Sequence, residues 1–253
     1  MNLKIFMSKI IQKQNFNADF GYCIRSSSIF YVPGQTINTK IILSNYWAFK
    51  NNTEVFIICN WRDINGKLIK RENIRFDNNN VYTIEAKKSF FGSCEIEAFA
   101  SKNLRIPYSA IMVVYECEKS ISMVHTYGRV YSNIEVEDGE TISDGHEGCW
   151  ILKDTNDITS FAVLHNGYEF QEAQNILLVI KNHKEEIKRI TFKCKALNPY
   201  ETLIIKPADY FKELVNFLDN KEGSCTMHYS LNKAFTRALL CWQTKDETQF
   251  QVT

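Results

Sequence analysis

The sequence carries almost no net charge and contains no long apolar run. Its 253 residues include 30 Lys and Arg against 29 Asp and Glu, a formal net charge of +1, whereas proteins that bind along a phosphate backbone rely on clustered basic residues. No uninterrupted apolar stretch is long enough to cross a bilayer. The N-terminal apolar segment is broken by Lys9 and Lys13, so it does not read as a signal peptide. We therefore expect no nucleic-acid binding, no membrane span and a cytoplasmic location.

The short motifs of common catalytic sites are also absent. The chain has no Gly-x-Ser-x-Gly, no His-Glu-x-x-His, no His-x-His, no Cys-x-x-Cys and no glycine-rich phosphate loop. His146, Glu147 and Cys149 are neighbours but lack the pair spacing of a zinc site, so we predict no metal and no cofactor. Paired carboxylates for glycoside hydrolysis leave no local spacing. The sequence therefore leaves open whether the protein is an enzyme, and it names no catalytic residue.

What the sequence does contain is an internal repeat. Leu43-Ser44-Asn45-Tyr46 and Leu164-His165-Asn166-Gly167 each close an apolar run, at an offset of 166 − 45 = 121. Gly92-Ser93-Cys94 matches Gly223-Ser224-Cys225 at 223 − 92 = 131. Such self-similarity indicates two divergent copies of one domain.

Each copy is rich in strand signals. Short runs of Val, Ile, Phe, Tyr and Thr with a period of two alternate with turns such as Asn65-Gly66. We predict an all-β fold of two tandem antiparallel β-sandwich domains related by internal duplication. Ala208–Asp219 has apolar residues at helical spacing after a proline, and predicts one short helix in the second domain.

The repeat also sets the expected domain boundaries. Residues 18–131 form the first predicted sandwich and residues 148–253 the second. An acidic stretch without a large apolar cluster, residues 132–147, is interpreted as a solvated linker, with a cation site as the alternative. Residues 1–17 precede the first sandwich as a short amphipathic helical segment.

The eight cysteines lie far apart in a chain without a secretory signal, so we expect them to be reduced. Cys23 and Cys94 correspond to Cys149 and Cys225, which resembles the immunoglobulin-like cysteine pair that brackets a strand tryptophan, here Trp61. A disulfide and a set of buried free thiols are the two alternatives, and buried thiols are favoured.

One predicted strand, Ser122–Tyr131, carries the sharpest candidate site. Alternation places His125, Tyr127, Arg129 and Tyr131 on one face. Aromatic rings offer flat surfaces to sugar rings, Arg provides a rigid fork for a carboxylate or phosphate, and His adds a directional hydrogen bond. A binding site, an oligomer interface and plain surface are the alternatives for this face.

A second group of candidates lies where equivalent strands run out into loops. Tyr46 and Trp47 take this place in the first copy, and His165 and Tyr168 in the second. The Asn at each turn is explained by its side chain closing the turn, which is the favoured interpretation. If the loops converge, the four side chains line a cleft.

Several segments resemble the small soluble transducer proteins that partner bacterial sensory rhodopsins. They are Gly148-Cys149-Trp150-Ile151, Ser160–Gly167, Ile176–Lys181 and Thr202–Tyr210, with Val113-Val114 and Met123-Val124-His125-Thr126 similar to that family's closing strands. The resemblance implies a cytoplasmic all-β sandwich that oligomerises and binds a ligand or partner. The tandem arrangement departs from the family's single domain.

These observations predict a non-enzymatic, homo-oligomeric binding protein. Its ligand is a carbohydrate or another small polar molecule, recognised through aromatic, His and Arg side chains. An enzyme acting on a sugar or sugar-derived substrate and a structural oligomerisation module are the alternatives.

Overall fold

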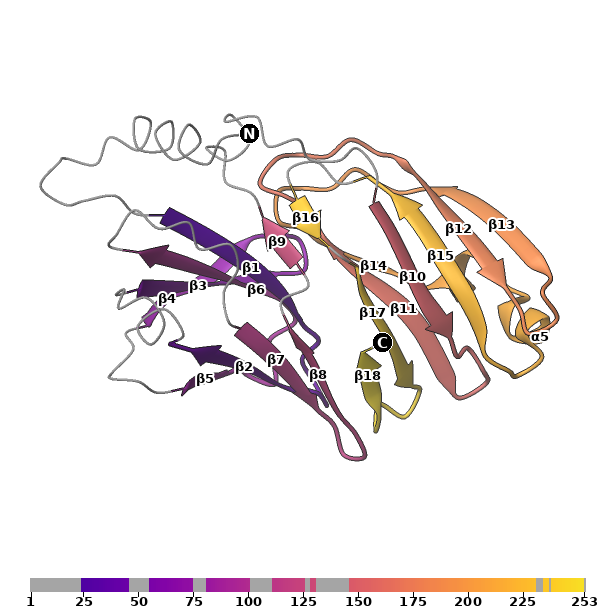
Figure 1. The fold of residues 1–253 in the computed structure, drawn as a ribbon, viewed down its shortest axis with the longest axis horizontal. Coiled ribbons are helices and arrows are strands. Elements are labelled where there is room, and N and C mark those ends of the chain that lie inside the picture. Colours follow the sequence, from indigo (N-terminus) through magenta and orange to yellow (C-terminus); the bar gives the residue numbers. More distant parts are fainter. Residues whose placement is uncertain are drawn as a thin grey trace, which may run out of the picture.

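The computed structural model describes residues 24–45, 55–74, 81–100, 111–125, 128–130, 146–230, 234–236 and 238–252. Over these residues the protein consists of antiparallel sheets and two short helices (Figure 1), which confirms the predicted all-β class. No helix in these ranges has the length and apolar character needed to cross a membrane. The predicted N-terminal helical segment lies outside them.

Two facing sheets form the first sandwich. Sheet I has the strand order β16-β9-β1-β6-β3-β4, and sheet II has the order β5-β2-β7-β8. The bounds of these strands are β1 Ile24–Val32, β2 Asn38–Ser44, β3 Val55–Asp63, β4 Leu68–Ile74, β5 Val81–Glu85, β6 Gly92–Ala100, β7 Ile111–Glu116, β8 Ile121–His125, β9 Gly128–Val130 and β16 Ala234–Thr236. Apolar residues that alternate along these strands, among them Phe30, Ile41 and Ile96, are buried between the sheets.

Two further sheets form the second sandwich. Sheet III has the order β10-β15-β12-β13, and sheet IV has the order β14-β11-β17-β18. The bounds are β10 His146–Leu152, β11 Ile158–His165, β12 Asn175–Lys181, β13 Ile187–Lys193, β14 Thr202–Ile205, β15 Gly223–Tyr229, β17 Leu239–Thr244 and β18 Phe250–Val252. The predicted helix is split into α4 (Pro207–Tyr210) and α5 (Leu214–Leu218), because the backbone is extended at Phe211.

The two sandwiches share one topology. The order β1-β6-β3-β4 in sheet I corresponds to β10-β15-β12-β13 in sheet III, and sheet II corresponds strand for strand to sheet IV. The pairing registers agree as well. Leu43 faces Tyr82 between β2 and β5, and Leu164 faces Leu203 between β11 and β14, which is the offset of 121 on both strands.

A hairpin turn repeats in atomic detail. The Asp63 Oδ1 atom accepts hydrogen bonds from the backbone N–H groups of Asn65 and Lys67, at 3.0 and 2.9 Å. In the second sandwich the Asn182 Oδ1 atom accepts from Lys184 and Glu186, at 2.9 and 3.0 Å. Since both turns close the same pair of strands, they are equivalent features of a duplicated domain.

The described cysteines are free thiols. They are Cys59, Cys94, Cys117, Cys149, Cys194, Cys225 and Cys241. Cys94 and Cys225 are buried in equivalent strands, as predicted, whereas Cys149 is exposed and makes no disulfide. Cys23 lies outside the described residues.

The sandwiches are joined by a shared hydrophobic core. Phe161, Val163 and Phe250, on the outer face of sheet IV, are buried in one cluster with the core of the first sandwich. The Phe250 ring lies 5.0 Å from the Tyr115 ring, edge to face. The backbone N–H groups of Phe250 and Val252 donate to the Ser120 and Ser122 hydroxyls, each at 2.9 Å. Sheet IV is therefore covered on both faces.

A strand from the second half of the chain also joins the first sandwich, since β16 pairs with β9 at the edge of sheet I. A segment of the second half thus extends a sheet of the first. The strand β10 begins at His146, inside the predicted linker. The exact domain boundaries stay a prediction.

Candidate functional site

The predicted strand face around His125 is not formed by one strand. Strand β8 pairs with β7 in sheet II and ends at His125, whereas β9 begins at Gly128 and pairs with β1 in sheet I. The prediction of a continuous strand over Ser122–Tyr131 is therefore wrong, because the chain passes from one sheet to the other after His125.

The side chains of that face are only partly described. His125 is exposed at the end of β8. Tyr127 and Tyr131 lie outside the described residues, as does the side chain of Arg129. Alternation along one strand can no longer be used to place these four residues together.

His165 and Asn166, where β11 ends in the second sandwich, are buried and hydrogen-bonded. His165 is fully buried, and its Nδ1 atom lies 3.0 Å from the Thr202 hydroxyl. Burial lowers the pKa of His165 to about 3, so the ring is neutral at physiological pH. The buried Asn166 amide donates to the carbonyl oxygens of Glu169 and Asn198, at 2.9 and 2.8 Å. This Asn closes its turn, as the favoured interpretation expects.

The structure describes one of the three remaining loop candidates. Tyr168 is half-buried, and Tyr46 and Trp47 lie outside the described residues. A cleft lined by the four loop residues therefore stays a prediction.

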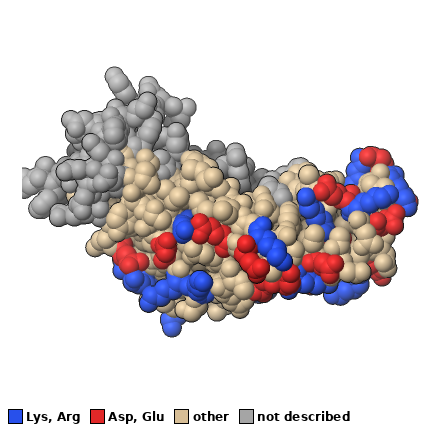
Figure 2. Space-filling model, turned by 90° about the horizontal axis from the view of Figure 1, so that it is seen from below, with Lys and Arg blue, Asp and Glu red and all other residues tan. Residues whose placement is uncertain are grey.

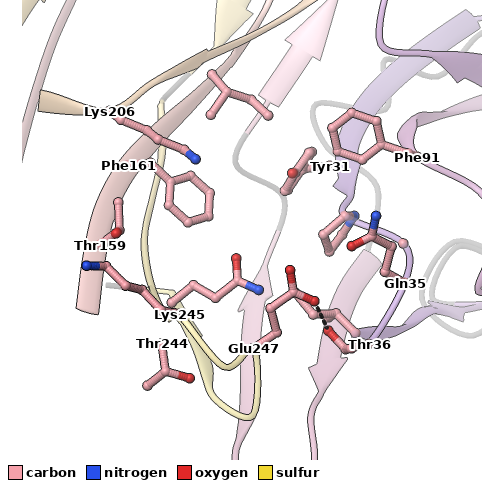
Figure 3. Close-up of a pocket in the computed structure, with 15 residues that line it drawn as sticks. Tyr31, Gln35, Thr36, Phe91, Thr159, Phe161, Lys206, Thr244, Lys245 and Glu247 are labelled. Carbon is pink, nitrogen blue, oxygen red and sulfur yellow. Dashed lines mark hydrogen bonds between the residues drawn. The ribbon is translucent and has the colours of Figure 1, made fainter. Parts of the chain in front are cut away.

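A cleft of about 410 Å³ lies elsewhere, between the two sandwiches (Figure 3). The connection from β1 to β2 forms one wall, and sheet IV with the β17–β18 turn forms the other. Its lining residues are Tyr31, Pro33, Gly34, Gln35, Thr36, Ile37, Phe91, Thr159, Phe161, Ile204, Lys206, Gln243, Thr244, Lys245 and Glu247. His125, His165 and Tyr168, the predicted site residues whose side chains the structure describes, are not among them.

Aromatic side chains from both sandwiches form the apolar part of the cleft. Tyr31 and Phe91 meet edge to face, with ring centroids 6.2 Å apart. Phe161 lies on the opposite wall (Figure 3). Burial, with a smaller contribution from Cys241, raises the pKa of the Tyr31 phenol, so Tyr31 remains protonated. Phe91 is 44% exposed, whereas Tyr31 and Phe161 are 4% and 5% exposed, so the accessible ring surface of the cleft comes mainly from Phe91.

Polar and basic groups surround these rings. Lys206 and Lys245 are both exposed and come from different turns of the second sandwich. The Thr36 hydroxyl donates to the Glu247 Oε2 atom at 3.1 Å, which links the two walls (Figure 3). Gln35 adds an amide on the first wall. The cleft therefore combines hydrogen-bonding groups with two ammonium groups.

Local backbone geometry holds the first wall in place. Gly34 has φ of +68°, and a Cβ atom there would lie 2.4 Å from the Phe90 carbonyl oxygen. The Gln35 N–H group donates to the Lys88 carbonyl oxygen at 2.6 Å. Only glycine fits this close backbone approach without strain, so the turn fixes the position of Gln35 and Thr36.

A second contact holds the sandwiches together on another side. The Arg62 guanidinium stacks 3.8 Å from the centre of the Tyr200 ring and pairs with the buried Glu95 carboxylate at 3.3 Å. The Thr202 N–H group donates to the Ile64 carbonyl oxygen at 3.0 Å. These contacts and the shared core restrict relative motion of the two walls.

Few of the described lining residues titrate near neutral pH. Among them Glu247 is the one carboxylate, and it accepts the Thr36 hydrogen bond. These described lining residues include no histidine or cysteine. Over the described part of the chain, no three His, Cys, Asp or Glu gather as a metal site would need. Both signs of charge are interspersed over the face in Figure 2, without one continuous basic surface.

The sequence offered one signal for this cleft. Residues 161–164 are a continuous apolar run, and such a run indicates a strand covered on both faces. In the structure every residue of β11 from Ser160 to His165 is buried. That pattern marks sheet IV as the partner of another layer. Nothing in the sequence marks the turns that supply Lys206 and Lys245.

Comparison with known proteins does not identify a family. No family model matches the chain, and no curated protein matches it. A solved structure of an anti-sigma factor domain-containing protein has 9% sequence identity and a TM-score of 0.25, covering 90% of this chain and 80% of that one. That similarity is too low to carry an argument. The resemblance to sensory rhodopsin transducers stays a prediction.

Proposed function

We propose that the protein is a non-enzymatic binding protein that holds a small polar ligand in the cleft between its sandwiches. One observation carries the proposal: aromatic rings from both domains and two lysine ammonium groups line a single cleft of about 410 Å³. Ligand sites prefer domain interfaces, and this volume lies within their usual range.

The lining suits a carbohydrate that carries an acidic group. The Phe91 ring, which is 44% exposed and contacts Tyr31 edge to face, can pack against the C–H face of a sugar. The Gln35 amide can bond hydroxyl groups, and Lys206 and Lys245 supply positive charge for a carboxylate or phosphate. Neutral sugars satisfy the rings and the amide but leave both ammonium groups without a partner.

Binding rather than catalysis is also what the transducer resemblance implies. An enzyme acting on a sugar would need at least two convergent titratable groups with acid and base roles. The cleft brings one carboxylate together with a protonated phenol and two lysines, which does not favour that alternative.

The test is calorimetric titration with glucose, glucuronic acid and glucose 6-phosphate. We expect the two acidic sugars to bind and neutral glucose to bind more weakly. The double variant Lys206→Ala/Lys245→Ala should lose about tenfold or more of the affinity for acidic sugars, the size of one charged hydrogen bond. Lys193→Ala removes an exposed lysine of β13 that does not line the cleft, and it serves as the matched control.

Two outcomes contradict the proposal. One is binding of acidic sugars that the double variant and the control weaken equally, which would place the ligand outside the cleft. The other is turnover of a bound sugar by the wild-type protein, which would support the enzyme alternative.

A further inference from the structure

The outer face of sheet IV has a structural counterpart in the first sandwich. Pairing registers set the correspondence: Gln243 faces Phe250 across β17 and β18, as Glu116 faces Ile121 across β7 and β8. Likewise Cys241 faces Val252, and Val114 faces Met123. Ile121 and Met123 therefore occupy the positions of Phe250 and Val252.

The two equivalent faces differ in exposure. Phe250 is fully buried against the first sandwich, whereas Ile121 is 68% exposed and Met123 57% exposed. Ile42 and Val114 lie beside them on the same outer face of sheet II. The first sandwich thus presents, uncovered, the face that its duplicate uses to bind a neighbouring sandwich.

The surface that receives sheet IV also has a counterpart. Tyr31 faces Ser93 next to Gly92, and Ile151 faces Ser224 next to Gly223, so Ile151 takes the position of Tyr31. Thr39 faces Tyr115 and Ser160 faces Trp242. Since β2 and β11 correspond at the offset of 121, Trp242 takes the position of Tyr115.

This second surface is open. Ile151 is 48% exposed, and Trp242 is half-buried beneath the Lys153 ammonium, 5.4 Å from its ring centroid. Ile151 and the half-buried Trp242 thus occupy, in the second sandwich, the positions that Tyr31 and Tyr115 take in the surface that receives sheet IV.

Charged residues replace aromatic ones at both free surfaces. Phe161 and Phe91 lie on opposite walls of the interdomain cleft. The counterpart of Phe161 in sheet II is Lys40, by the β2–β11 offset of 121. The counterpart of Phe91 in the second sandwich is Glu222, because each directly precedes the equivalent glycine, Gly92 or Gly223. The two phenylalanines that line the intrachain cleft are thus replaced by charged residues on the two free surfaces. Both are held at the surface by ion pairs, Lys40 with Glu116 at 2.8 Å and Glu222 with Lys153 at 3.0 Å.

We infer that copies of this chain associate head to tail. The outer face of sheet II in one copy packs on the Ile151 and Trp242 side of the second sandwich in another copy, repeating the contact that joins the two sandwiches within the chain. Because the two surfaces differ, the contact is heterologous, and each copy keeps one free surface of each kind. Association continues into rings or filaments instead of stopping at a symmetric dimer.

Sedimentation velocity over a wide range of protein concentration tests the inference. We expect the wild-type average mass to rise with concentration beyond two chains of 29.5 kDa each. Ile121→Arg and Ile151→Arg place a charge at either surface, and since both side chains are exposed, thermal unfolding should be unchanged. Each variant alone should remain monomeric. Ile69→Arg, at an exposed position of β4 in sheet I and outside both surfaces, should assemble like the wild type.

Mixing the two variants is the decisive step. Ile121→Arg keeps an intact receiving surface and Ile151→Arg keeps an intact sheet II face, so the mixture should form species of two chains and none larger. A wild-type protein that stays monomeric at every concentration overturns the inference. It is also overturned if Ile121→Arg alone abolishes association while Ile151→Arg has no effect, which would show sheet II pairing with itself.

Discussion

Phe250→Ala is expected to destabilise the protein far more than Ile121→Ala, although the two residues occupy the same position of the duplicated fold. Phe250 is fully buried, with ring centroids 5.0 Å from Tyr115 and 6.1 Å from Phe161. Removing a fully buried Phe costs about 3 to 5 kcal/mol, the sum of lost transfer free energy and the cavity left behind. Ile121 is 68% exposed, so its removal should change the free energy of unfolding by about 0.5 kcal/mol or less.

The assay is equilibrium unfolding in urea, followed by near-ultraviolet circular dichroism at a concentration where the wild type is monomeric. The Phe250→Ala midpoint should fall, and the transition should broaden or split as the sandwiches lose their shared core. Affinity for the cleft ligand should fall as well, since Phe161 loses a neighbouring ring. Equal, small effects of the two variants would refute the shared core, because they would show that Phe250 is not buried between the sandwiches in solution.

Two further predictions concern single positions. The pKa of His165 is about 3 in the folded protein against 6.5 unfolded, so its contribution to stability is fully present above pH 6.5 and is lost as the pH falls toward 3. Near pH 5.5 this loss is on the order of 1 kcal/mol. In the His165→Gln variant, the difference between the free energies of unfolding measured in urea at neutral pH and at pH 5.5 should be smaller by this amount. An unchanged difference would contradict the prediction. Gly66→Ala should cost more than about 1 kcal/mol in the same assay, because Gly66 has φ of +84° and its Cβ would lie 2.1 Å from the Pro199 carbonyl oxygen. The equivalent turn position, Glu185, already carries a side chain at φ of 67°, so Glu185→Ala is the control and should shift stability by less than about 0.5 kcal/mol.

The parts of the fold that the sequence predicts are those set by local patterns. Alternation along β2 and β11, ended by an Asn in each, gives the offset of 121 that the strand pairings reproduce. Turn residues such as Asp63 and Asn182 act within five residues of chain. Such features need no knowledge of which sheet lies opposite.

The errors arise where a strand chooses distant partners. Alternation continues through Ser122–Tyr131, yet β8 pairs with β7 while β9 pairs with β1 and β16. The two-residue alternation of side chains along a predicted strand cannot detect that change of sheet. The cleft escaped prediction for the same reason, since its walls come from turns and outer strand positions that meet only when the two sandwiches pack.

The cleft arises where the two copies have diverged on the outer faces of equivalent sheets. In sheet II, Lys40 and Glu116 lie on that face and form an ion pair at 2.8 Å. Their counterparts in sheet IV are Phe161 and Gln243, which line the cleft. An ion pair can face water, whereas an aromatic ring and an amide gain more from a covering surface and a ligand with hydroxyl groups. The differences between the copies that let sheet IV pack on the first sandwich thus also bring Phe161 and the Gln243 amide to the cleft lining. Domain packing and ligand binding should therefore respond together to changes at Phe161.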